Sequence, residues 1–270
     1  MRIFVLAALF AARLYAAGDI DEAFQRLYNF NFPAAHAVVD THIAAHPEEP
    51  FPYAVRAAAY LFYELDRLGL LEGEFFTDDD RIAAKRRLKP DPATRVKFNQ
   101  AVADAQARAQ KVLTVRPDDR DALFTMCMTQ GMVTDYLALV EKHQIRSLNT
   151  AKLSNSYAQR LLRADPQFYD AYLSTGISEY LLGSLPFFIR WFEHFENVQG
   201  NKDQGIRNLK LVAERGHYMR PFAKILLGIA YMREKKPRNA EQVLAELTQE
   251  YPQNPLLRKE LLKVQAVLRQ

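Results

Sequence analysis

Apolar residues recur at helical spacing through the stretch from Phe222 to Pro252, which holds the clearest pattern in the chain. Two sets of apolar positions follow the i, i+3, i+4, i+7 order of one helix face: Phe222, Ile225, Leu226 and Ile229, and then Ala240, Val243, Leu244 and Leu247. Pro237, between the two sets, suits the first turn of a helix because no N–H is needed there. The stretch therefore predicts two amphipathic helices joined as an antiparallel hairpin.

A motif runs through the same stretch, with Leu227, Gly228 and Tyr231 at the spacing L-G-x-x-Y, followed by Ala240, Leu244 and a closing Pro252. This order resembles the tetratricopeptide (TPR) repeat, a helix–turn–helix unit of about 34 residues. Lys224 departs from the family pattern, which has a large residue at that position. The resemblance implies an all-α fold in which helical hairpins stack side by side as a right-handed α-solenoid.

Weaker copies of this unit end at three further prolines, and acidic or amide residues follow all four: Pro47, Pro117, Pro166 and Pro252. Proline stops one helix, and the residues after it cap the next helix. One register through these prolines predicts a single domain of five hairpins, at about 19–47, 52–117, 119–166, 168–216 and 219–252. Leucines mixed with charged residues over 254–268 indicate a terminal capping helix with one solvated face.

Hairpins two, three and four are longer than the repeat that they resemble. Their extra residues fall between the first and second helix, at roughly 66–93, 134–147 and 184–202. In a solenoid these turns project from one edge, and insertions along one side often mark a binding side. The alternative interpretation is that the insertions lengthen the helices and carry no function.

Composition narrows the class of protein without naming a ligand. With 270 residues, 49% hydrophobic content, 13 Pro and 10 Gly, the chain favours long helices over a sheet. A net charge of +4 gives no argument for nucleic-acid binding. The single cysteine, Cys127, excludes an internal disulfide and a cysteine-based metal cluster. We expect no cofactor and no metal.

The first residues, MRIFVLAALFAARLYAAGD, contain a basic residue, an apolar run from Ile3 to Ala12 and small residues before Gly18. This order is typical of a signal peptide over residues 1–17 and indicates a periplasmic or secreted protein. Arg13 and the bulky Tyr15 fit that pattern less well, so the alternative is an uncleaved helix packed on the first hairpin, and a cytoplasmic protein. No later segment reaches the ~18 consecutive apolar residues of a transmembrane helix.

The TPR resemblance also implies which residues line the concave surface, since two positions of each first helix face it. In this register they are Ile20, Phe24, Ala54, Ala58, Phe124, Met128, Leu173, Ile177, Ile225 and Ile229, all of them apolar. Our candidate binding residues on the first helices are Phe124, Met128, Leu173, Ile177, Tyr180, Ile225 and Ile229. An apolar groove costs ~25 cal/mol for each Å² left in water, so we expect something to cover it.

The insertion after the fourth hairpin's first helix is rich in aromatic residues, and Phe187, Phe188, Trp191 and Phe192 complete the list of candidate binding residues. We hypothesise that this segment folds onto the concave surface and plugs part of it. Two alternatives stay open. The segment forms an exposed aromatic patch for a protein partner or a membrane surface, or it extends the packing between the helices.

Candidate catalytic or metal-binding groups are few. His42 and His46 lie four residues apart on a predicted helix, but no third ligand follows at a set spacing, so we expect a packed or hydrogen-bonded His42. Cys127 occupies a small-residue position and should be buried. Carboxylates such as Glu64 and Asp66 are expected at helix ends or on solvated faces. No phosphate-binding loop, dinucleotide-binding motif or nucleophile elbow is present.

These observations favour a non-catalytic scaffold or adaptor that binds another polypeptide through the concave groove or the edge with the insertions. The alternative function is a carrier or sensor of a small apolar ligand, enclosed between the groove and the segment 184–202. An enzyme would require a cluster of titratable groups in one pocket. The repeat register predicts no such cluster.

Overall fold

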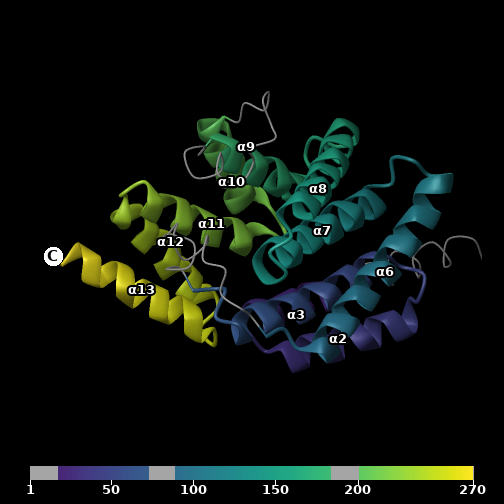
Figure 1. Ribbon diagram of the computed structural model, residues 1–270, viewed down its shortest axis with the longest axis horizontal. Coiled ribbons are helices and arrows are strands. Elements are labelled where there is room, and N and C mark those ends of the chain that lie inside the picture. Colours follow the sequence, from purple (N-terminus) through teal and green to yellow (C-terminus); the bar gives the residue numbers. More distant parts are fainter. Residues whose placement is uncertain (1–17, 73–88, 184–200, 270) are drawn as a thin grey trace, which may run out of the picture.

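The computed structural model describes residues 18–72, 89–183 and 201–269. The predicted signal peptide over residues 1–17 lies outside these ranges, as do Phe187, Phe188, Trp191 and Phe192 of the aromatic insertion. Within the described ranges every regular element is a helix, and the helices pack in consecutive pairs (Figure 1). The prediction of an all-α fold built from helical hairpins is confirmed.

In the described ranges five helical hairpins follow one another, and a last helix covers the fifth (Figure 1). The first helix spans residues 18–28. The remaining elements are α2 (Phe32–Ala45), α3 (Phe51–Arg67), α6 (Pro92–Val115), α7 (Arg120–Asp135) with the π-helical turn η1 (Tyr136–Val140), α8 (Gln144–Ala164), the short turn η2 (Tyr169–Ala171), α9 (Tyr172–Gly183), α10 (Lys202–Arg215), α11 (Arg220–Arg233), α12 (Pro237–Glu250) and α13 (Pro255–Leu268).

Polar side chains cap several helix starts, which explains where these helices begin. The carboxylate of Asp91 accepts the Thr94 backbone N–H at 2.9 Å at the start of α6. The carboxylate of Asp119 accepts the Ala122 N–H at 3.1 Å at the start of α7. Asn201 does the same for α10. Each cap satisfies an N–H group that has no partner inside its own helix.

The register assigned to the fifth hairpin places its apolar residues correctly. Leu227 is 3% exposed and Leu244 is 8% exposed, and both lie between the two helices of the hairpin. The packing of this hairpin does not require a glycine at position 228, because a Cβ atom there would lie 3.5 Å from the Val243 side chain, an ordinary contact distance. A tighter helix approach lies between α9 and α10. A Cβ on Gly205 of α10 would lie 2.4 Å from the backbone nitrogen of Tyr180 in α9.

The row of hairpins closes on itself, which its local sequence pattern does not predict. The Tyr28 hydroxyl of the first helix donates to the Tyr218 carbonyl at 2.9 Å, just before α11. The Asn254 amide, at the start of α13, donates to the Tyr28 carbonyl at 2.8 Å. The rings of Phe24 and Tyr218 stack with centroids 4.8 Å apart. The first hairpin therefore lies against the fifth hairpin and the last helix, so that part of the concave surface is buried by the chain itself.

Glu64 lies in the last turn of α3, one of the two kinds of place expected for it, and its side chain is only 1% exposed. Both of its carboxylate oxygens accept from the Arg67 guanidinium at 2.8 Å, and one also accepts the Asp91 backbone N–H at 2.7 Å. This carboxylate is buried because it joins the end of α3 to the start of α6 across the second hairpin's insertion. Asp66, one of the other carboxylates named above, is exposed.

One described helix, Arg120–Val140, is long and apolar enough by composition to cross a membrane. It consists of α7 and η1, and 56% of its most apolar 18-residue stretch is buried inside the structure. That burial is also typical of the central helix of a helical bundle.

Candidate functional site

The first helices of all five hairpins converge on a small, partly open pocket, which we call the axial pocket. It has a volume of about 130 Å³. Four of the predicted binding residues line it: Phe124, Met128, Leu173 and Ile177. Ile225, Ile229 and Tyr180 are not among its lining residues, and Tyr180 is instead buried between α9 and α10. Closure of the hairpin row leaves room in the concave surface for a pocket rather than a groove.

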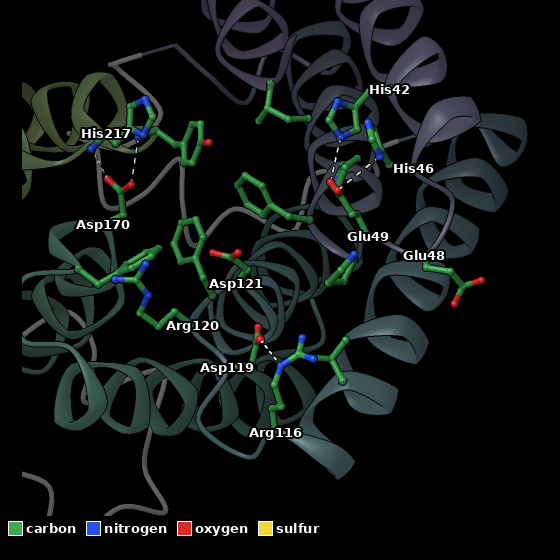
Figure 2. A pocket seen from close by; sticks show the side chains of 18 of the residues that line it. His42, His46, Glu48, Glu49, Arg116, Asp119, Arg120, Asp121, Asp170 and His217 are labelled. Carbon is green, nitrogen blue, oxygen red and sulfur yellow. Dashed lines mark hydrogen bonds and ion pairs between the residues drawn. The ribbon is translucent and has the colours of Figure 1, made fainter. Parts of the chain in front are cut away.

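A much larger hollow lies where successive hairpins are joined, at the starts of the first helices, and we call it the loop-side cleft (Figure 2). Its volume is about 1090 Å³. The four connections between the hairpins contribute to it, at residues 46–52, 116–121, 167–170 and 215–218. None of these connections was singled out as a binding site from the sequence.

Aromatic rings form the apolar part of the cleft lining. Phe51 lies 5.3 Å from Phe124 and 5.0 Å from Tyr218, measured between ring centroids. Phe168 lies 5.0 Å from Phe124 on the other side. Three hairpin connections and α7 thus contribute rings to one continuous cluster. Tilted rings at these distances give a rigid apolar surface.

Two histidines and a glutamate stand together in the cleft wall (Figure 2). His42 is 1% exposed, and its Nε2 lies 3.0 Å from the Glu49 carboxylate. His46 Nδ1 lies 3.7 Å from the other oxygen of that carboxylate. The prediction of a packed, hydrogen-bonded His42 is confirmed. Among the described residues no group of three or more His, Cys, Asp or Glu is arranged to hold a metal ion.

Asp170 is a buried and well hydrogen-bonded carboxylate of the cleft lining. It accepts three backbone N–H groups, from His217 at 2.8 Å, Tyr218 at 3.0 Å and Met219 at 3.1 Å, directly before α11. Burial raises the pKa of Asp170, and the three N–H donors oppose that shift. Gly216 leaves space for this carboxylate, since a Cβ there would lie 2.7 Å from it.

The arginines of the cleft are paired with acidic or aromatic groups. Arg116 donates to the Asp119 carboxylate at 2.9 Å. Arg120 donates to the Asp165 carboxylate at 2.6 Å, and this ion pair joins two successive connections between hairpins. Arg215 donates to the Tyr169 hydroxyl at 3.2 Å. The cleft therefore carries mixed charge, much of it already used to fix the loops.

The prediction that no pocket would hold a cluster of titratable groups is wrong. The repeat register describes the helix faces, whereas these groups lie in the connections and at the helix ends. Acidic residues collect there because carboxylates are favoured at helix N-termini. None of the described residues that line the cleft is serine, threonine or cysteine, so no hydroxyl or thiol nucleophile of that kind stands beside its histidines.

A signal for the cleft was present in the sequence. An aspartate stands four residues after two of the helix-ending prolines, Asp121 after Pro117 and Asp170 after Pro166. Both aspartates line the cleft.

Cys127 is buried, as expected, and its desolvation raises the pKa of the thiol to about 11.

Comparison of the chain with protein-family models, with curated proteins and with solved structures gave no match.

Proposed function

We propose that this chain is a non-catalytic binding protein of the TPR type, which holds a segment of another polypeptide in the loop-side cleft. The observation that carries the proposal is the size and lining of the cleft. Its volume of about 1090 Å³ exceeds the ~300–1,000 Å³ of pockets for small molecules. A short stretch of extended chain needs such a volume.

The chemistry of the lining supports a peptide ligand. An apolar centre surrounded by hydrogen-bonding groups is the usual anatomy of a protein interface, in which aromatic and arginine side chains supply most of the binding energy. Phe51, Phe168 and Tyr218 provide such a centre here, and Arg116 and Arg120 stand at its rim. The hydrogen bonds that fix Asp170 and Arg120 make the site preformed, which lowers the entropy cost of binding.

The roles of the charged groups favour binding over catalysis. Asp119 and Asp170 are engaged with helix starts, and Arg120 with a neighbouring connection. The described lining offers the histidines no Ser, Thr or Cys nucleophile to activate. In this proposal the protein acts outside the cytoplasm, as its predicted signal peptide indicates. The row of hairpins is taken to form a right-handed superhelix, as in the family that it resembles.

The alternative function, a carrier of a small apolar ligand, is favoured by the axial pocket. Four predicted binding residues line that pocket, but its volume of about 130 Å³ suits one ring rather than a drug-sized molecule.

Selection from a random-peptide display library tests the proposal, followed by fluorescence anisotropy with the selected peptides. Gln167 is exposed and lines the cleft, so Gln167→Trp fills space in it. We expect that substitution to weaken peptide binding by about tenfold or more, equivalent to about 1.4 kcal/mol. Gln110→Trp, at an exposed position of α6 outside the cleft lining, is the matched control and should bind as the wild type does. Failure to select any peptide, or equal binding by both variants, contradicts the proposal.

A further inference from the structure

Asp135 stands at the end of α7, where the helix passes into the π-helical turn η1. It lies on the helix face that also carries Met128, Gly131 and Met132, and like them it lines the axial pocket. π-Helical turns within helices are rare and are often found at functional sites. No sequence motif marks this aspartate.

The part-exposed Asp135 carboxyl differs from Glu64 and Asp170, the buried carboxyls among the described residues. Glu64 is satisfied by Arg67 and a backbone N–H, and Asp170 by three backbone N–H groups. Asp135 forms no hydrogen bond or ion pair with any residue in the described part of the chain, and partial desolvation in the pocket raises its pKa to about 7. A carboxyl that lines a pocket without a protein partner is free to bind a cationic ligand there.

The pocket around Asp135 is apolar, with a few hydroxyl groups. Leu61, Phe62, Met132, Ile177 and Phe222 supply the apolar lining, from α3, α7, α9 and α11. Ser154, Ser174 and Ser178 add hydroxyl groups from α8 and α9. The volume of about 130 Å³ is close to the ~150 Å³ of an apolar cavity that holds one benzene molecule. An apolar group of one ring or a short branched chain fits.

We propose that the axial pocket binds a small organic ammonium ion that carries one apolar group, such as an arylmethylamine, with its ammonium held by Asp135. A cation supplies the partner that the carboxylate lacks, and the apolar group fills the space between the first helices. This site adjoins the loop-side cleft, with which it shares Phe124 and Asp170 in its lining, and it goes beyond the proposed polypeptide binding.

Binding of a cation should depend on pH through Asp135. The ammonium binds the ionised carboxylate, so affinity should rise as pH increases from 5 to 8, through the carboxyl's pKa of about 7. The other titratable groups that line the pocket are Tyr28, Cys127 and Asp170. Burial raises the pKa of Tyr28 and Cys127, which keeps both uncharged in this range. Burial also raises the pKa of Asp170 against its three N–H donors, so the Asp135→Asn variant is needed to assign the pH dependence to Asp135.

Calorimetric titration of the full chain with benzylamine, and with benzyl alcohol as its neutral analogue, tests the proposal. At pH 8 we expect the amine to bind about tenfold or more tightly than the alcohol, and Asp135→Asn to remove that preference. Asp66→Asn is the matched control, because partial desolvation and nearby Glu72 also raise the pKa of the exposed Asp66, which lies outside the pocket lining. This variant should keep the preference for the amine.

Labelled methionine methyl groups locate the bound amine, since Met128 and Met132 line the pocket and should shift in NMR spectra. Absence of benzylamine binding, equal affinity for the amine and the alcohol, or tighter binding of the alcohol would each overturn the proposal. Amine binding that persists in Asp135→Asn would do so too. None of these results bears on peptide binding at Gln167, so the failure of one proposal is distinguishable from the failure of the other.

Discussion

Replacement of Glu64 by glutamine tests whether the buried ion pair holds the second hairpin together. The substitution keeps the side-chain shape and removes the charge. Arg67 then faces a neutral amide in place of two carboxylate oxygens at 2.8 Å, and the Asp91 N–H at 2.7 Å loses a charged acceptor. The join between α3 and α6 should weaken as a result.

The expected loss follows from the burial of the pair. Breaking a buried ion pair by removing one partner typically costs about 3–5 kcal/mol, because the other charge stays desolvated. Arg67 is 37% exposed and can turn toward water, which limits that penalty. We therefore expect Glu64→Gln to lower the free energy of unfolding by about 3 kcal/mol, at the lower end of that range.

Glu179 offers a matched control within the same protein. Its carboxylate accepts the Asn201 backbone N–H at 2.7 Å, which likewise lies at the start of the second helix of a hairpin. That bond is exposed to solvent, so Glu179→Gln should cost only about 1 kcal/mol or less. Urea unfolding of both variants and the wild type, followed by circular dichroism at neutral pH, gives the two differences. Equal losses for the two variants, or a loss below about 1 kcal/mol for Glu64→Gln, would refute the reasoning.

Three further predictions concern single residues. Gly205→Ala should lower the free energy of unfolding by about 1–3 kcal/mol or more, since its Cβ would meet the Tyr180 backbone at 2.4 Å. Gly228→Ala should be neutral or stabilising, because a Cβ there makes only ordinary contacts. Urea unfolding of the two variants checks this, and equal effects contradict it. Asp135→Asn should be more stable than the wild type at pH 8, by at most about 4 kcal/mol. Burial raises the carboxyl pKa from 3.8 to about 7, so the stability of the wild type falls as pH rises between these values. The difference between variant and wild type should vanish near pH 4, and a difference independent of pH contradicts the assignment. Cys127 should react slowly with a thiol reagent in the native protein at pH 8 and fast in urea, because burial raises the thiol pKa to about 11; fast native labelling contradicts that burial.

Helix positions were predictable from the sequence because periodicity is local. The spacing of Leu227 and Leu244 placed both in the interior, and the register placed Phe124 on the surface that became the axial pocket. The loop-side cleft was not predictable in the same way. Phe168 and Tyr218 lie outside the helical stripes, so no periodicity marks them.

Contacts between distant segments were the other unpredicted feature. Glu64 meets Asp91 across an insertion, and Tyr28 meets Tyr218 through closure of the hairpin row. The resemblance to a repeat family predicts how each hairpin packs against the next one. It does not predict whether the first hairpin also packs against the last. The isolated carboxyl of Asp135 likewise becomes notable only once its neighbours are known.

Closure of the hairpin row is the central claim, since it buries the concave surface and forms both the axial pocket and the loop-side cleft. In a Cys127→Ser background, Asp21→Cys and His217→Cys replace an ion pair whose atoms lie 2.8 Å apart between the first helix and the residues before α11. Treatment with a short bismaleimide should give a cross-link within one molecule at every protein concentration, with the two single-cysteine variants as controls. The account predicts near-complete intramolecular cross-linking. An open row of hairpins would give either no cross-link or only links between molecules, and that result would contradict it.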